Sequence, residues 1–126
     1  MARVDDLLAV ARSRLDRLDP EEASAALADG ALLIDIRTDH QRAADGVVPG
    51  AVYVPRNVLE WRLDPASEHR GARLARPDAT IVLMCDAGYQ SSLAAATLQD
   101  LGLPKATDLD GGFQAWRAAG LPVERP

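Results

Sequence analysis

The amino-acid sequence predicts an α/β domain in which helices cover both faces of a central parallel sheet. Short apolar runs that are typical of buried strands alternate along the chain with segments whose apolar residues recur at helical spacing. Elements that alternate in this way form parallel sheets with helices on both faces. The length of 126 residues suits one domain, and the apolar content of 48% is ample for a single core.

The first two elements are predicted to be helices. Apolar residues recur at helical spacing over residues 4–18, with charged residues between them, which indicates an amphipathic helix. Asp19 and Pro20 then have the pattern of an N-cap and a first helical residue, and they begin a second helix. We expect residues 1–18 to be a helix appended to the domain, which covers it or mediates dimerisation, and residues 19–126 to be the domain itself.

The remaining elements follow in order. Four short apolar runs are predicted strands: Leu32–Arg37, Val52–Val54, Ile81–Met84 and Ala106–Leu109. Helices are expected over residues 57–63, with Asn57 as N-cap, over 91–101 and over 113–119. Phe113 and Trp116 share one face of the last helix and are expected in the core. Both histidines, His40 and His69, lie in polar, loop-like stretches, and residues 66–78 are a predicted surface loop.

The only cysteine, Cys85, follows directly after the predicted strand 81–84 and precedes a helix. The thiol therefore lies at the carboxyl end of a strand, in a tight loop that leads into a helix N-terminus. Backbone N–H groups of such a turn can surround an anion, and the helix dipole favours negative charge there. A lone cysteine is otherwise most often a small buried hydrophobe. A strand-to-helix turn with a glycine is a poor place for a core residue, so we interpret Cys85 as a nucleophile.

Composition excludes several classes of function. The net charge is −5 and no basic tract is present, which argues against nucleic-acid binding. One cysteine rules out an internal disulfide, a CxxC redox pair and a thiolate zinc cluster, and no metal is expected. No apolar stretch approaches the ~20 residues that span a bilayer, and no signal-peptide run is present. We therefore expect a cytoplasmic protein without a membrane partner, and the arginine-rich, alanine-rich composition suggests a bacterial genome.

Four segments resemble, in the same order, motifs of the rhodanese family of sulfurtransferases. They are Leu33–Arg37 (Leu-Ile-Asp-x-Arg in the family), Gly46–Ala51 (Gly-x-Ile-Pro-Gly-Ala), the active-site loop Cys85–Gln90, and Gly111–Trp116 (Gly-Gly-Phe-x-x-Trp). The matches extend from about Leu32 to Val123 and so cover most of the chain. The resemblance implies a rhodanese-like three-layer α/β/α fold with a central parallel sheet.

The resemblance also implies an activity. A sulfurtransferase of this kind would take a sulfane sulfur from thiosulfate or a persulfide donor, hold it as a persulfide of Cys85, and pass it to a thiophilic acceptor. No metal or organic cofactor is implied. Because the chain has no second cysteine, it cannot resolve the persulfide as a disulfide, so the acceptor must be external: cyanide, a thiol or a sulfur-accepting protein.

Several residues are predicted to support Cys85. The backbone amides of the loop are expected to bind the anionic donor; they belong to Asp86, Ala87, Gly88, Tyr89, Gln90 and Ser91. Many rhodaneses carry a basic residue where Gln90 stands, and Arg56 and Arg62 are candidates to supply that charge here. Asp35 and Arg37 end a buried strand, so both need partners, and we expect a structural ion pair.

Two other functions are compatible with the residues. The acidic Asp86 beside the nucleophile and the uncharged Gln90 would suit a rhodanese-like interaction module or sulfur carrier with little turnover. Phosphatase or arsenate-reductase chemistry is less favoured, because it needs a longer loop ending in an arginine that binds a tetrahedral oxyanion through two hydrogen bonds.

Overall fold

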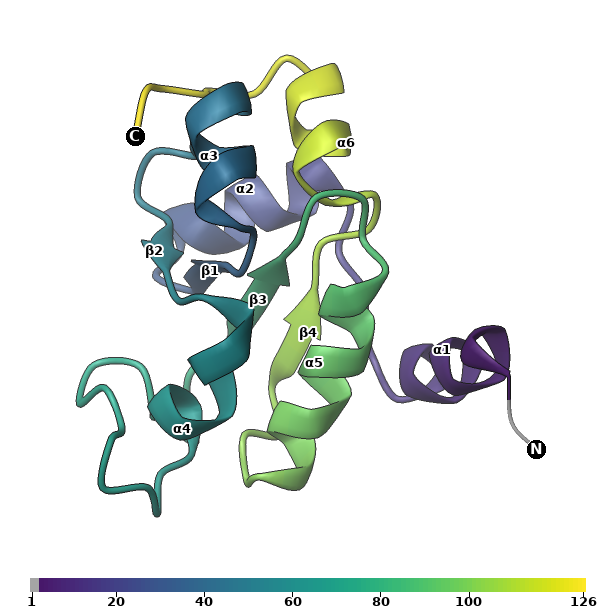
Figure 1. The fold of residues 1–126 in the computed structure, drawn as a ribbon, viewed down its shortest axis with the longest axis vertical. Helices are drawn as coiled ribbons and strands as arrows, with labels where there is room; N and C mark the ends of the chain where they lie inside the picture. Colours follow the sequence, from purple (N-terminus) through teal and green to yellow (C-terminus); the bar gives the residue numbers. More distant parts are fainter. Residues whose placement is uncertain (1–2) are drawn as a thin grey trace.

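A parallel four-stranded sheet lies at the centre of the molecule (Figure 1). The computed structural model describes residues 3–126. The strands are β1 (Leu32–Asp35), β2 (Val52–Tyr53), β3 (Ile81–Met84) and β4 (Ala106–Asp108), in the order β2-β1-β3-β4. Every neighbouring pair is parallel, which confirms the predicted fold class. The cysteine thus follows β3, a central strand.

Helices cover both faces of this sheet. Their bounds are α1 (Val4–Ser13), α2 (Pro20–Ala28), α3 (Asp39–Asp45), the 3₁₀ helix η1 (Arg56–Val58), α4 (Leu59–Leu63), α5 (Gln90–Asp100) and α6 (Gly112–Ala118). Core side chains of α4 and α5 pack on one face, and those of α2 and α6 pack on the other. Figure 1 shows α1 standing outside this body, on the side of α5, which it contacts.

The buried strands divide their side chains between two cores by simple alternation. Ile81 and Leu83 of β3 face the core of α4 and α5, whereas Val82 and Met84 face the core of α2 and α6. Cys85 continues this alternation and packs on the α5 side. Phe113 and Trp116 are buried, as predicted, in the opposite core.

The first helix is shorter than predicted. α1 ends at Ser13 rather than at residue 18, and Leu15 inserts into the core of α4 and α5. The amide of Leu18 donates to the carbonyl of Asp108 at 3.1 Å, and the amide of Asp110 donates to the carbonyl of Leu18 at 2.8 Å. Hydrogen bonds to the end of β4 therefore replace the last helical turn.

Two local predictions are wrong. The polar stretch with His40 forms α3, which begins with a capping box: Thr38 Oγ1 accepts from the Gln41 amide at 3.1 Å, and Gln41 Oε1 accepts from the Thr38 amide at 3.2 Å. Asn57 is not an N-cap, because the chain enters a 3₁₀ turn at Arg56 and Asn57 lies inside it. The predicted start of α2 at Asp19 and Pro20 is confirmed.

Candidate functional site

Cys85 lies directly after β3 and is 2% exposed. Its Sγ accepts a hydrogen bond from the backbone amide of Gly88 at 3.1 Å. The thiol also donates to the Ser91 hydroxyl, with Sγ and Oγ 3.3 Å apart. The loop therefore curls back on the sulfur, and one of its amides already points at it.

The rest of the loop presents further donors. α5 begins at Gln90 and runs for 11 residues, so its positive end lies at this loop. Among residues 3–126, no hydrogen bond is donated by the backbone amides of Ala87, Tyr89 and Gln90. These N–H groups are the kind that an anion at a helix N-terminus takes up.

The opposite side of the loop is attached to α6. The amide of Phe113 donates to the carbonyl of Cys85 at 2.9 Å, and the amide of Gln114 donates to the carbonyl of Asp86 at 3.1 Å. Gly112 has a φ of +61°, and a Cβ there would lie 2.5 Å from the Cys85 carbonyl oxygen. Only glycine allows this approach, which explains the glycine directly before Phe113.

Asp86, which follows the nucleophile, has its carboxylate bound to α6. Its Oδ1 accepts from Gln114 Nε2 at 2.8 Å. The same Gln114 nitrogen lies 3.2 Å from Asp45 Oδ2 at the end of α3. The carboxylate of Asp86 is thus bound by a side chain of α6.

A buried carboxylate, Asp108, lies behind the cysteine. It is fully buried at the end of β4, and its Oδ2 accepts from the hydroxyls of Ser91 at 2.7 Å and Ser92 at 2.8 Å. Arg17 Nε donates to its Oδ1 at 2.9 Å. Asp108, Ser92 and Arg17 were not among the predicted site residues. A charged residue at the end of a buried strand was the one available signal, since the same argument singled out Asp35.

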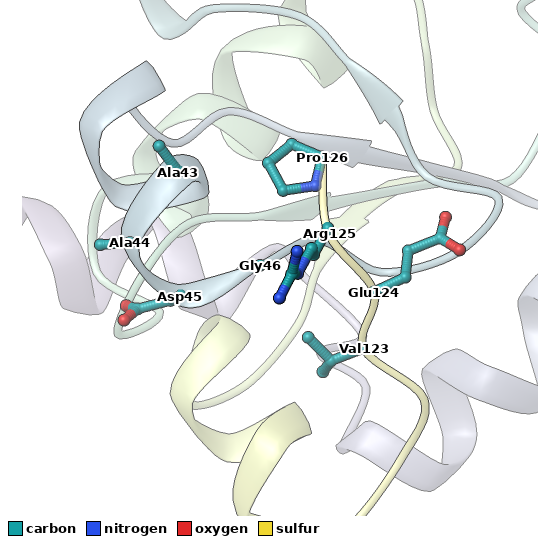
Figure 2. Close-up of a pocket in the computed structure, with 8 residues that line it drawn as sticks. All are labelled: Ala43, Ala44, Asp45, Gly46, Val123, Glu124, Arg125 and Pro126. Carbon is teal, nitrogen blue, oxygen red and sulfur yellow. The ribbon is translucent and has the colours of Figure 1, made fainter.

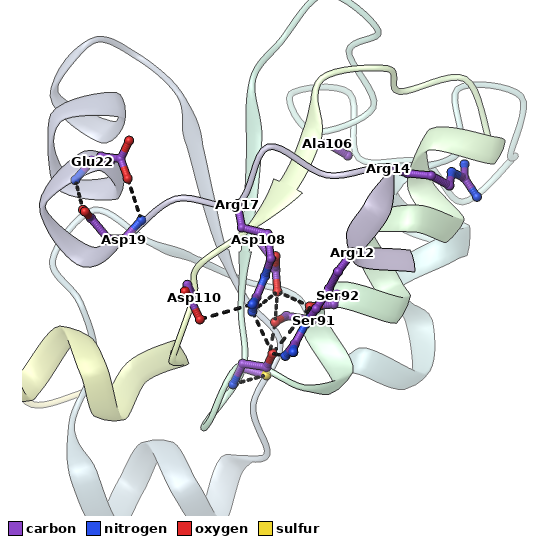
Figure 3. Close-up of polar contacts among 12 residues, drawn as sticks. Arg12, Arg14, Arg17, Asp19, Glu22, Ser91, Ser92, Ala106, Asp108 and Asp110 are labelled. Atoms are coloured by element: carbon purple, nitrogen blue, oxygen red, sulfur yellow. Dashed lines mark hydrogen bonds and ion pairs between the residues drawn. The ribbon is translucent and has the colours of Figure 1, made fainter. Parts of the chain in front are cut away.

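Two arginines from the segment before residue 19 reach this loop (Figure 3). Arg12 Nη2 and Arg17 Nη2 donate to the carbonyl of Gly88 at 2.8 and 2.9 Å. Burial lowers the pKa of Arg17, but the hydrogen bond to Asp108 and the charges of Asp108, Asp110 and Cys85 outweigh it and raise that pKa above its ordinary value. Arg17 therefore carries its positive charge beside the site.

Asp35 and Arg37 form a pair of their own, and both are buried. Arg37 Nε and Nη2 donate to the two Asp35 oxygens at 3.0 and 2.8 Å. Arg42 Nε adds a contact to Asp35 Oδ2 at 3.3 Å, and the Arg37 guanidinium lies 3.9 Å from the centre of the Phe113 ring. This geometry suits the structural role that the sequence suggests.

The two candidate charge partners lie in different surroundings. Arg56 borders a cavity of about 500 Å³ that also includes Gln90, whereas Arg62 does not border it and donates to the carbonyl of His69 at 2.8 Å. Arg56 is paired with Glu60 at 2.7 Å. The arrangement favours Arg56 over Arg62. The lining residues are Ile36, Arg37, Thr38, Asp39, Tyr53, Pro55, Arg56, Asn57 and Gln90.

A larger cavity, of about 680 Å³, lies between the end of α3 and the C-terminal segment (Figure 2). Residues 43–46 and 123–126 line it, and none of them belongs to the cysteine loop. Across residues 3–126, no three His, Cys, Asp or Glu side chains are grouped so that they could hold a metal ion. No helix in this range is long and apolar enough to cross a membrane.

A family model and several known proteins match this chain over most of its length. The model of the rhodanese-like domain matches residues 19–119. A sulfurtransferase of Allochromatium vinosum is 32% identical over 114 residues, which cover 89% of this chain and 97% of that protein. The thiosulfate sulfurtransferase GlpE of Pseudomonas entomophila is 37% identical over 106 residues, which cover 84% of this chain and 88% of that protein.

Among solved structures, a protein of unknown function from Rhodopseudomonas palustris, described as a possible tyrosine phosphatase, superimposes with a TM-score of 0.90. It is 34% identical, and the match covers 98% of this chain and 96% of that one. The family model begins at residue 19, whereas this structural match includes nearly all of the segment before it.

Proposed function

The chain belongs to the rhodanese-like domain family, and from this premise we propose that it is a sulfurtransferase that carries sulfur on Cys85. The observation that carries the proposal is the hydrogen bond from the Gly88 amide to Cys85 Sγ at 3.1 Å, at the N-terminus of α5. A donor aimed at the sulfur stabilises the anionic forms of that sulfur, and both the thiolate and the persulfide are anionic.

The reaction divides into two displacements. The thiol proton passes to solvent, and the Cys85 thiolate attacks the sulfane sulfur of thiosulfate. The sulfur–sulfur bond of thiosulfate breaks, sulfite leaves with the electron pair, and the anionic persulfide of Cys85 remains. Cyanide or a thiolate then attacks the outer sulfur and releases the Cys85 thiolate. Covalent catalysis of this kind replaces one transfer by two easier ones.

The loop and its neighbouring cavity would bind the donor. The amides of Ala87, Tyr89 and Gln90 donate no hydrogen bond within residues 3–126 and would surround the anion. Arg56 borders the cavity next to Gln90 and would supply positive charge for the approach of the donor. Because Cys85 is 2% exposed, a donor must reach it with a small end, and a terminal sulfane sulfur meets this requirement.

The structure favours turnover over the two other functions. Gln114 binds the Asp86 carboxylate at 2.8 Å, which weakens one of the two sequence arguments for an inactive interaction module. The description of the Rhodopseudomonas palustris protein as a possible tyrosine phosphatase belongs to that protein. In this chain α5 begins at Gln90, and the loop has no arginine to bind a phosphate with two hydrogen bonds.

Partner and compartment follow from the same chemistry. The chain holds one cysteine, so the sulfur must leave to an external acceptor, either a small thiophile or a protein thiol. The nucleophile must stay reduced to react, which favours the cytoplasm as the place of work.

The test combines mass and turnover. After incubation with thiosulfate, the intact mass of the protein should increase by one sulfur atom, and cyanide should remove it. Cys85→Ser should show no added sulfur and no thiocyanate formation, while its melting temperature stays close to that of the unchanged protein. Substantial thiocyanate formation by the folded serine variant would refute covalent transfer through Cys85. A chain that takes up no sulfur from thiosulfate or from a persulfide would favour the interaction module.

A further inference from the structure

The segment before residue 19 lies outside the matched family domain, yet two of its arginines bind Gly88, the residue whose amide donates to the nucleophile. Arg12 and Arg17, which Figure 3 labels, both donate to the Gly88 carbonyl, at 2.8 and 2.9 Å. Gly88 also provides the amide that donates to Cys85 Sγ. The Arg12 guanidinium lies 5.6 Å from the centre of the Tyr89 ring and so contacts the next loop residue as well. Two cations on one carbonyl fix the loop at Gly88.

A second path from Arg17 reaches the sulfur through Asp108 and Ser91. Arg17 donates to both oxygens of Asp108, at 2.9 and 3.2 Å, and Ser91 donates to Asp108 Oδ2 at 2.7 Å. A serine hydroxyl has one proton to donate. While that proton is on the side of Asp108, the Ser91 oxygen can only accept from the Cys85 thiol, which is the arrangement observed, with Sγ and Oγ 3.3 Å apart.

The charge of the sulfur changes during the reaction, and this arrangement must change with it. A thiolate or an anionic persulfide needs a donor, and the lone pair of Ser91 would repel it. The hydroxyl can turn to the sulfur only if Asp108 stays satisfied without it. Arg17 and Ser92 remain as donors to Asp108, so a fully buried carboxylate is not left without partners.

We propose that Arg17 is a positioning residue of the sulfur transfer: it neutralises Asp108 so that the Ser91 hydroxyl can turn to the Cys85 sulfur, and, together with Arg12, it fixes Gly88. This inference rests on the proposed function, in which the thiolate displaces sulfite from thiosulfate and becomes a persulfide anion. Arg17 enters no bond-making step. It acts on the sulfur through Ser91 and Gly88.

Arg14 provides a matched control within the same segment. It also joins this segment to the domain, through a salt bridge to Asp100 at 2.6 Å and a hydrogen bond to the Ala96 carbonyl at 3.2 Å, both on α5. It has no contact with the cysteine loop among the hydrogen bonds and ion pairs of residues 3–126. Loss of Arg14 therefore reports what attachment of the segment alone contributes.

The experiment compares Arg17→Gln with Arg14→Gln in the thiosulfate:cyanide assay and measures the half-life of the persulfide by intact mass. Arg17→Gln should lower kcat by about tenfold and shorten the persulfide half-life, because the Ser91 hydroxyl can no longer turn to the anionic sulfur. The KM for thiosulfate should change by less than about twofold, because the loop amides that bind the donor remain. Arg14→Gln should leave kcat and half-life unchanged. Arg17→Lys, which keeps the charge without the planar fork, should recover part of the loss.

A double variant tests whether Arg17 acts on the sulfur through Ser91. Ser91→Ala alone should lower kcat, and the double variant Arg17→Gln/Ser91→Ala should lose no more than about twofold beyond the worse single variant, because both act on the same step. Arg12→Gln removes one donor to Gly88 and should lower kcat by about threefold. This variant tests the proposal if Arg17→Gln does not fold. A folded Arg17→Gln with unchanged kcat and half-life would overturn the proposal, as would losses that simply multiply, or unchanged turnover in a folded Arg12→Gln. These outcomes differ from failure of the proposed function, in which the unchanged protein itself takes up no sulfur.

Discussion

Two buried aspartates lie on either side of β3, the strand directly before the nucleophile, and they differ in the side chains that they bind. Asp35 of β1 pairs in register with Met84 of β3, and Asp108 of β4 pairs with Leu83. Both are buried, at 1% and 0% exposure, and each is bound by an arginine. The sheet therefore places one ion pair on each side of β3, just before Cys85.

The two ion pairs differ in the residues to which they are hydrogen-bonded. Arg37 follows Asp35 by two residues, the remaining side-chain contact of Asp35 goes to Arg42, and Arg37 Nη2 also donates to the Gly46 carbonyl. We call this the closed pair, because none of these hydrogen bonds reaches the cysteine loop. Arg17 and Asp108 are 91 residues apart, and Asp108 Oδ2 also takes up the Ser91 hydroxyl that contacts Cys85. A buried ion pair can therefore serve the stability of the fold alone or also position an active-site residue. The other hydrogen bonds of its carboxylate determine which of these roles it has.

The largest expected effect breaks the closed pair. Arg37→Ala removes the guanidinium from Asp35, which stays buried with the Arg42 contact at 3.3 Å and the backbone amide of residue 37 at 3.0 Å. The substitution should lower the free energy of unfolding by about 3–5 kcal/mol. Denaturation with urea measures this. Arg70→Ala, which removes an exposed hydrogen bond to the Ser67 carbonyl, is the control and should change stability little. If Arg37→Ala loses activity while its stability is unchanged, the pair belongs to the active site after all.

The same comparison separates what the sequence could predict from what it could not. The strand before Cys85, its glycine turn and the cap at Asp19 depend on signals that act over a few residues, and they appear in the structure as expected. The early end of α1 was not predicted, because hydrogen bonds from Leu18 to the distant end of β4 replace a helical turn. No local pattern indicates which distant arginine reaches a buried carboxylate, so Arg17 was missed and Arg37 was not.

A pair of nearly isosteric changes sharpens the comparison at the two aspartates. Asp108→Asn replaces an oxygen that accepts from the serines and Arg17, and should lower kcat by about tenfold at a smaller cost in stability than Arg37→Ala. Asp35→Asn should lower the melting temperature but leave kcat per folded molecule within about twofold. Measuring kcat and the urea midpoint of both variants shows whether each aspartate affects turnover or only stability. Equal kcat losses at the two positions would mean that the two pairs do not differ as described.

The smallest expected effect concerns the open side of the loop, where Gln90 and Arg56 border the same cavity. The Asp108 side positions the loop, whereas the cavity side should recruit the donor. Gln90→Arg would add a guanidinium at this mouth and, because the site is open to water, should increase kcat/KM for thiosulfate by about fivefold, or ~1 kcal/mol. The gain should shrink as salt is added, because screening weakens the attraction.

The matched control places the same charge on a polar side chain outside the cavity. Gln99 donates to the carbonyls of Arg14 and Ala106 at the far end of α5, and Gln99→Arg gives an equal change in net charge without lining the cavity. Both variants should be measured in the same series of salt concentrations. An equal increase from Gln99→Arg would assign the effect to overall charge. An unchanged or lower kcat/KM at low salt in a folded Gln90→Arg would show that this side of the loop does not recruit the anion, and that donor binding depends on the backbone amides alone.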